Sequence, residues 1–439
     1  MTSKFQTYVR YKPSGIDWLG NIPEGWQVVA FKELFKPSNE KVKDDPLIEL
    51  PLSVSGYRGV EQRDVTSMEG QMPSDDVKEY RIVREGQLAV NTMWLNYTGL
   101  GVSEYEGYIS PAYRSYNINS KIHKRFAHHL LRSILYVQKY TSLLYGVRPN
   151  SLQVKTYDFE HIEILLPPLE IQKRIADFLD EKAKIIDGLI AKKEKWIELL
   201  HEKRITLISC VVTKGLNPNA KFKSSGIDWL GDIPEDWRVK KLKFIFSVQA
   251  SNVDKKSYEG EKEVYLCNYV DVYNNEYISS SISFMSATAT TDQLKNLALQ
   301  SNDIIITKDS EMPSDIGVPA IVKENITDLV CGYHLYLLRS LDKGVLSGYV
   351  FRFLQSSNVK RYFETHSNGV TRFGLGAYEV NNIPVPIPLW KEQSQIVSFL
   401  DTETAKIDKT IALIESQIEK LKEYRSSLIN AAVTGKIKI

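Results

Sequence analysis

Cysteine is scarce in this chain of 439 residues, with three residues in all. Cys210, Cys267 and Cys331 form no CxxC pair, which argues against a zinc ribbon or a disulfide framework and favours a reducing compartment, the cytoplasm. No run of about 18 apolar residues occurs, so we expect no membrane span and no membrane partner. The 56 Lys and Arg residues nearly balance the 54 Asp and Glu residues, giving a net charge of +2. Charge excess therefore does not by itself indicate a nucleic-acid partner.

Motifs of catalysis are also missing. There is no GxxxxGK[ST] phosphate loop, and 99–101 and 374–376 are isolated GxG fragments that read as turns. No Asp/Asn-Pro-Pro-aromatic motif of an amino-methyltransferase appears. His161, His334 and His366 stand alone, without a second ligand at helical spacing, so we expect no metal site. The sequence predicts a binding protein that is not an enzyme and that holds no cofactor.

The chain repeats itself. Residues 14–26 read SGIDWLGNIPEGW and residues 225–237 read SGIDWLGDIPEDW. Later features recur in the same order: a short buried strand (86–91 and 302–307), a helical stretch (123–144 and 346–364), a glycine turn followed by arginine, and a β-like run rich in proline. This order favours duplication of half the protein over duplication of one surface segment.

A long helix follows each proline run, and we predict these helices over about 170–212 and 391–433. Neither contains an internal proline. In the second, apolar residues recur every seven positions from Leu400 to Leu428, which is the seam of a coiled coil. The first has a similar seam that Lys193 interrupts. A helix of this length with one apolar stripe needs a partner, and the other copy is the simplest one.

The predicted fold is therefore α+β: two similar globular α/β domains related by an internal pseudo-twofold repeat and separated by a pair of long coiled-coil helices. A parallel pair would put the domains side by side, whereas an antiparallel pair would put them at opposite ends. The short connection 214–224 favours the antiparallel pair. We expect a first domain over 1–166, a first helix over 167–215, a second domain over 216–388 and a second helix over 389–439.

Two like modules joined by a rigid rod suit a bipartite target, and double-stranded DNA is one such target. The alternative is a coiled-coil scaffold with two protein-binding modules, and geometry alone does not separate them. Residue chemistry favours DNA, because Arg, Lys, Asn and Tyr beside glycines suit base edges and phosphates. The candidate DNA-binding residues are Arg58, Arg63, Asn91, Tyr97, Arg148, Asn150, Lys308, Thr371 and Arg372.

The sequence resembles the specificity subunit (HsdS) of Type I restriction-modification systems over nearly its whole length. The resemblance is carried by 15–20 and 226–231 with their IPE-x-W continuations, by 167–180 and 387–401, and by 428–435, which closes the second helix.

The resemblance implies two target-recognition domains, each reading one half of a split DNA sequence, with the antiparallel helices as a spacer. It implies two methyltransferase subunits docked on those helices, joined by restriction subunits. S-adenosylmethionine, ATP and Mg²⁺ would belong to these partners. Candidate partner-binding residues on the helices are Ile186, Leu189, Trp196, Leu200, Ile407, Ile414, Leu421 and Leu428.

Overall fold

A computed structural model describes residues 5–45, 47–63, 76–146 and 152–439. Its contacts divide the chain into two compact units, which are Met1–Lys193 with Glu415–Ile439, and Glu194–Ile414. Each unit thus holds one globular domain and a part of both long helices. The division falls inside the helices because each helix segment packs against the domain beside it. The domain bounds predicted from the repeat stay a prediction.

The core of the first unit is a four-stranded antiparallel sheet with the order β4-β11-β8-β9. Its central strand β8 is fully buried, as the sequence predicts for 86–91. Helices α2 (Lys124–Leu131) and α3 (Ile134–Ser142) pack their apolar side chains on this core. The strands are β4 (Phe35–Ser38), β8 (Leu88–Val90), β9 (Leu100–Val102) and β11 (Arg114–Ile118).

The second unit repeats this sheet in the order β18-β26-β22-β24, with β20 added at the edge. Strand β22 is the buried counterpart of β8, and the duplication therefore extends from the motifs to the strand order. The strands are β18 (Phe246–Ala250), β20 (Tyr277–Ile278), β22 (Ile304–Thr307), β24 (Pro319–Val322) and β26 (Leu335–Ser340).

The remaining elements surround these sheets and differ most between the units. Those of the first unit are β1 (Tyr11–Pro13), β2 (Asn21–Pro23), β3 (Gln27–Ala30), α1 (Phe31–Leu34), η2 (Val42–Asp44), β5 (Leu52–Ser55), β6 (Gly59–Gln62), β7 (Arg81–Val83), η3 (Leu95–Tyr97), β10 (Gly107–Ile109), β12 (Leu144–Tyr145), β13 (Gln153–Val154), α4 (Thr156–Glu160) and β14 (Glu163–Leu166). Those of the second unit are β15 (Phe222–Ser224), β16 (Asp232–Pro234), β17 (Arg238–Lys241), η5 (Leu242–Phe244), β19 (Lys262–Cys267), α6 (Tyr269–Asn274), β21 (Met285–Ala289), α7 (Thr291–Leu297), β23 (Asp309–Ser310), η6 (Pro313–Asp315), β25 (Leu329–Cys331), β27 (Phe373–Gly374), α10 (Ala377–Asn382) and β28 (Pro384–Ile387).

Each helical stretch that the sequence predicts as one helix is in fact two. The first breaks at Ser133 into α2 (Lys124–Leu131) and α3 (Ile134–Ser142). The second breaks before Ser356 into α8 (Ser347–Leu354) and α9 (Ser357–His366). The Ser356 side chain accepts a hydrogen bond from the backbone N–H of Val359, and such a cap starts a new helix.

The IPE-x-W continuation of the repeated motif packs against the C-terminal end of a long helix in each unit, α11 (Trp390–Val433) in the first and α5 (Leu169–Lys214) in the second. Gly435 follows α11 in a left-handed conformation, with a φ of 72°. A Cβ there would lie 2.5 Å from Pro23 Cγ and 3.2 Å from Trp26. Gly215 follows α5 in the same way and faces Trp237. Glycine is required at these positions because the backbone approaches a buried tryptophan at a positive φ.

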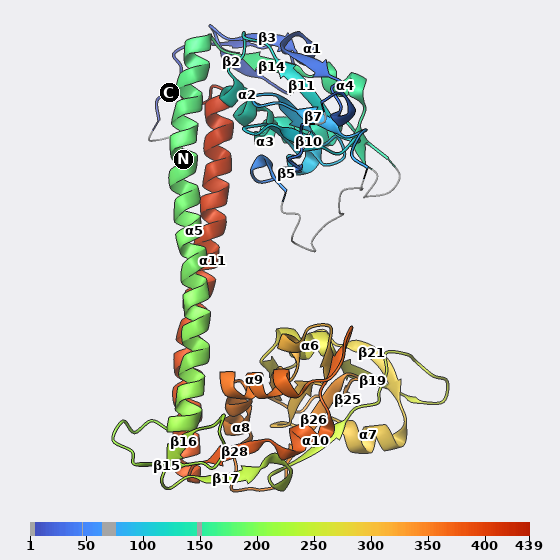
Figure 1. Cartoon of the computed structure of the whole chain (residues 1–439), viewed down its shortest axis with the longest axis vertical. Helices are drawn as coiled ribbons and strands as arrows, with labels where there is room; N and C mark the ends of the chain where they lie inside the picture. Colours follow the sequence, from blue (N-terminus) through green and yellow to red (C-terminus); the bar gives the residue numbers. More distant parts are fainter. Residues whose placement is uncertain (1–4, 46, 64–75, 147–151) are drawn as a thin grey trace. The chain divides into compact units, whose positions relative to one another are not determined.

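The long helices are α5 (Leu169–Lys214) and α11 (Trp390–Val433), within two residues of the predicted bounds. They run side by side and antiparallel within each unit (Figure 1). The seam residues of α11 are buried except Leu421, which is half-buried, so the seven-residue repeat predicts the packed face. Lys193, which interrupts the seam of α5, donates a hydrogen bond to Gln417 at 2.5 Å. Among the described residues, no helix is long and apolar enough to cross a membrane.

Candidate nucleic-acid interface

The segment that follows the central strand lies in the same place in both units. After β8 it covers 91–98 and contains η3, and after β22 it covers 308–316 and contains η6. In the first unit, Val154 N donates to Thr92 O at 3.2 Å. In the second, Leu375 N donates to Lys308 O at 2.9 Å. Each unit therefore joins this segment to the stretch after its glycine turn, which is 152–154 in the first unit and 370–375 in the second. We call the two joined segments of a unit its loop pair.

In the second unit the arrangement brings three predicted DNA-binding residues together. Strand β23 pairs with β27, and Arg372, which follows Thr371, contacts Asp309, the neighbour of Lys308. The turn before them needs glycine at position 369, where φ is 153° and a Cβ would lie 1.9 Å from Arg372 O. Sequence reasoning had found these residues separately, and strand pairing makes them neighbours.

The surface around these residues combines cations with aromatic rings. Arg372 and Met312 are exposed, and so is Tyr333. Lys308 Nζ lies 4.5 Å from the centre of the Tyr333 ring, within cation–π distance. Exposed cations suit phosphates and base edges, and exposed rings suit stacking or apolar contacts with bases.

The matching segment of the first unit is more aromatic. Trp94 and Tyr97 are both exposed, and their ring centres lie 5.8 Å apart. Asn91, in contrast, is buried, and its Oδ1 accepts a hydrogen bond from Met93 N at 3.2 Å. In this structure the Asn91 amide shapes the loop, and its predicted contact with DNA stays a prediction.

Arg58 lies exposed on the turn between β5 and β6, next to a side chain that binds the long helix. Tyr57 Oη donates to Asp187 Oδ1 of α5 at 3.0 Å. Arg63 follows β6, is half-buried and has a partner of its own. Arg148 and Asn150 lie outside the described residues, so their predicted role stays a prediction.

An aspartate at equivalent positions of the two long helices holds each domain. Asp180 of α5 accepts hydrogen bonds from His129 at 2.7 Å and from Arg125 at 2.9 Å. Burial raises the pKa of Asp180, but these hydrogen bonds outweigh it and hold the pKa well below its usual range. Asp401 of α11 accepts from the buried guanidinium of Arg352 at 2.6 Å. Sequence reasoning missed this role, although both residues end a repeated Phe-Leu-Asp block.

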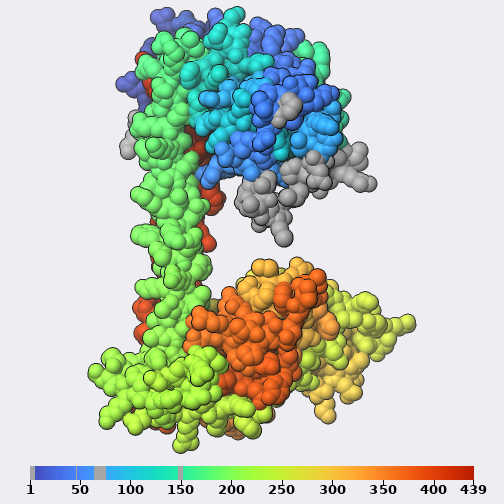
Figure 2. All heavy atoms as spheres, viewed as in Figure 1, coloured from blue at the N-terminus to red at the C-terminus, as the bar shows by residue number. Residues whose placement is uncertain are grey.

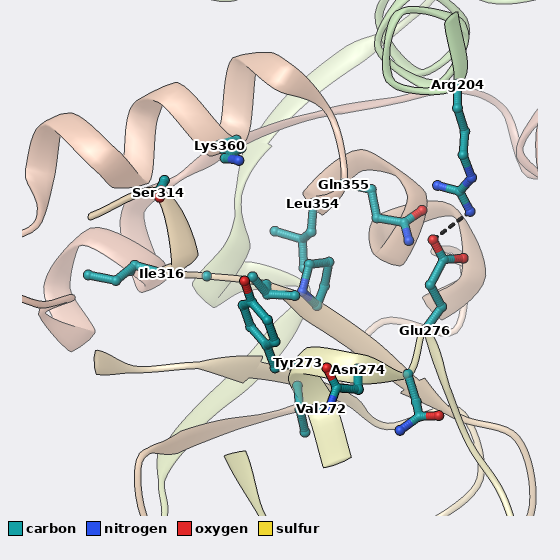
Figure 3. A pocket seen from close by; sticks show the side chains of 14 residues that line it. Arg204, Val272, Tyr273, Asn274, Glu276, Ser314, Ile316, Leu354, Gln355 and Lys360 are labelled. Carbon is teal, nitrogen blue, oxygen red and sulfur yellow. Dashed lines mark hydrogen bonds and ion pairs between the residues drawn. The ribbon is translucent and has the colours of Figure 1, made fainter. Parts of the chain in front are cut away.

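A cavity of about 280 Å³ lies where α5 meets the second domain. Figure 3 shows Arg204 reaching from the helix to Glu276, which closes one side of the cavity. Glu276 also pairs with Arg352, and Arg204 pairs with Asp408 of α11. The ion pairs thus link both long helices to the domain.

The predicted partner-binding residues divide into two groups. Four are buried and offer no open surface: Ile186, Ile407 and Ile414 on the helix pair, and Leu428 in the core of the first unit. Their predicted contact with a partner stays a prediction. Leu200 and Leu421 are half-buried. Leu189 and Trp196 are exposed, because they lie one position before Ile190 and Ile197, which face the seam of α5. Figure 2 shows that side chains of α5 form part of the molecular surface.

Among the described residues, no group of three or more His, Cys, Asp or Glu side chains is arranged to hold a metal ion.

The fold and these surfaces define a class of protein with two like domains, each of which presents a loop pair beside its central strand and is fastened to paired helices. The family model described as Type I restriction modification DNA specificity domain matches residues 97–199 and 234–423. The chain belongs to this family, whose relatives are named as specificity subunits and not as catalytic subunits.

Two relatives come from Methanocaldococcus jannaschii. The chain is similar to the Type I restriction enzyme MjaVIII specificity subunit, with 28% identity over 290 residues, 64% of this chain and 63% of the relative. It is also similar to the putative type I restriction enzyme MjaX specificity subunit, with 25% identity over 96% of each chain. These matches support the DNA-specificity alternative, and none of them supports a protein scaffold.

The fold is similar to that of a chain in a solved structure described as the basis of complex assembly and conformational transition of the type I R-M system. The TM-score is 0.69 and the identity 15%, over 94% of this chain and 98% of that chain. This likeness confirms the predicted fold class.

Proposed function

We propose that this chain is the DNA sequence-specificity subunit of a Type I restriction-modification complex and that each domain reads one half of a split double-stranded target. The observation that carries the proposal is the shared loop pair beside β8 and β22, with exposed cations or rings in both units. Two copies of one reading arrangement in one chain fit two half-sites. A subunit that reads DNA for modification would work in the cytoplasm.

The paired helices act in this proposal as the spacer that sets the gap between the half-sites. The antiparallel seam supports it, because packed helices are stiff. Inserting one heptad into each helix, after Lys192 and after Ile418, keeps the seam in phase and adds about 10 Å. We expect the methylated motif to keep both halves and to gain about three base pairs between them.

Two methyltransferase subunits are proposed to dock on the helices, and restriction subunits to join them. The exposed apolar side chains Leu189 and Trp196 support this, because solvent-facing apolar groups on a helix suit a partner helix. S-adenosylmethionine, ATP and Mg²⁺ would be bound by these partners.

The deciding experiment is methylation sequencing of cells that carry this chain with its methyltransferase subunit as the only modification system. We expect adenine methylation at a split motif that disappears when this chain is deleted. The same methylation pattern without the chain would refute the proposal.

A further inference from the structure

Three side chains in the second unit meet at the loop pair described above. Asp309 follows β22, His334 precedes β26 and Arg372 follows the glycine turn. Arg372 Nη2 lies 2.8 Å from Asp309 Oδ1. His334 Nδ1 lies 2.7 Å from the same oxygen and 2.9 Å from Asp309 Oδ2. One carboxylate thus holds both a guanidinium and an imidazole.

Burial falls along this group from the carboxylate to the guanidinium. The side chain of Asp309 is 15% exposed, that of His334 is 27% exposed and that of Arg372 is 57% exposed. The order means that the anion is built into the domain and that the cation projects from it. An arginine used only to neutralise Asp309 would not need to face solvent.

Hydrogen bonds join the backbone segments under the group. Lys308 N donates to His334 O at 2.8 Å, and Lys308 O accepts from Leu375 N at 2.9 Å, so three chain segments are joined at one residue. His334 has a φ of 72°, a left-handed conformation that is uncommon for residues other than glycine. Such conformations persist where the surrounding structure determines them, and they concentrate at functional sites.

The chemistry of Arg372 then points to a guanine. A guanidinium carries five N–H donors, and only Nη2 meets the group: it lies 2.8 Å from Asp309 Oδ1 and 3.2 Å from His334 Nδ1. Each guanidinium edge with two parallel N–H groups includes Nη2, and the second N–H of Nη2 with a neighbouring N–H of Nη1 or Nε makes a planar fork that matches the O6 and N7 acceptors of guanine in the major groove. A fork held in one orientation loses less freedom on binding than a mobile one.

We propose that Arg372 reads a guanine in the half-site of the second domain and that Asp309 and His334 are the positioning residues that aim its guanidinium. This inference rests on the proposed function and adds the base and the residues that select it. In the first unit, hydrogen bonding places Met93 where Asp309 stands in the second. Apolar Met93 cannot hold an arginine there, and the two domains read by different chemistry.

The test uses the complex of this chain with its methyltransferase subunits and duplexes that carry its mapped motif. Discrimination is the ratio of methylation rates between the cognate duplex and one with the guanine pair replaced. We expect Arg372→Lys to lower discrimination roughly 5- to 150-fold, because lysine keeps the charge and loses the fork. We expect Asp309→Asn and His334→Gln to lower it roughly 2- to 10-fold at the same base pair.

Two further measurements separate positioning from a merely structural role. A duplex with 7-deazaguanine, which lacks the N7 acceptor, slows the wild-type complex and leaves the Arg372→Ala complex unaffected. In the Arg372→Ala background, Asp309→Asn changes discrimination no further, since it acts through the arginine. Asp342→Asn is the matched control: it removes the carboxylate partner of Lys240, at the other end of β26, and leaves discrimination unchanged.

The outcomes distinguish this inference from the proposed function. A split motif without guanine in the half-site altered by Arg372→Ala overturns the inference alone. The inference is also overturned if Asp309→Asn leaves discrimination intact. It is overturned too if Asp309→Asn lowers discrimination as much in the Arg372→Ala background as in the wild-type chain. Trp94→Ala, in the first domain, should alter the other half-site and thereby assign the domains. A wild-type complex that methylates no split motif overturns the proposed function and this inference together.

Discussion

The buried guanidinium of Arg352 allows a prediction about which partner of an ion pair matters more. The Arg352 side chain is 1% exposed and that of Asp401 is 43% exposed. Arg352 also contacts Glu276 at 3.3 Å and Tyr277 Oη at 2.7 Å. Removing Asp401 leaves a buried cation short of a partner, whereas removing Arg352 leaves carboxylates that water can reach.

We expect Asp401→Ala to lower the free energy of unfolding of the second unit by about 2–3 kcal/mol. Breaking a fully buried pair costs about 3–5 kcal/mol, and the value is reduced here because Glu276 still pairs with Arg352. Arg352→Met, which keeps much of the volume, should cost about 0–1 kcal/mol because no buried charge remains. The double variant should match Arg352→Met alone.

Urea unfolding of the full chain gives these free energies, and hydrogen exchange of α8 assigns the change to the second unit. Arg361→Met is the control: this exposed arginine on α9 should change stability by less than about 0.5 kcal/mol. The reasoning fails if Arg352→Met destabilises more than Asp401→Ala, since burial of the unpaired charge would then not decide the cost.

Three further predictions concern stability and assembly. Burial lowers the pKa of His128 and His129, so the unfolded chain binds more protons than the folded chain below pH 6.5. Thermal unfolding at falling pH should therefore show the first unit losing up to about 1.4 kcal/mol of stability per pH unit for each histidine. A first unit whose stability does not change with acid would contradict this. Differential scanning calorimetry should show that Gly435→Ala destabilises the chain by about 1–3 kcal/mol, because the added Cβ meets Pro23 and the backbone has a positive φ. Gly188→Ala should instead stabilise the chain by about 0.5–1 kcal/mol, because Gly188 lies in mid-helix with open space around it. Trp196→Glu should weaken methyltransferase binding more than about tenfold in titration calorimetry, with the melting temperature of the free chain unchanged.

The long helices could be predicted almost to the residue because their signals are local. A seven-residue apolar period and the lack of proline are properties of consecutive residues, and each end is marked by a proline run or a glycine. The same locality misled at 123–144 and 346–364. There the apolar period continues through Ser133 and Ser356, while the fold needs the chain to turn.

The candidate site shows the other limit. Lys308, Thr371 and Arg372 were each predicted from their residue type, but nothing in the sequence paired Arg372 with Asp309. The burial of Asn91 was equally hidden, because asparagine at the end of a strand suits a loop and a groove contact alike.

The sequence by itself determined the duplication, the two long helices and the family, since repeats, periods and motifs are written in the order of residues. Only the tertiary structure decided which charged groups meet: Asp309 with Arg372, and Arg352 with Asp401. The physical reason is that helix periodicity follows from bonds between near neighbours, whereas an ion pair depends on strand pairing and packing that join segments distant along the chain.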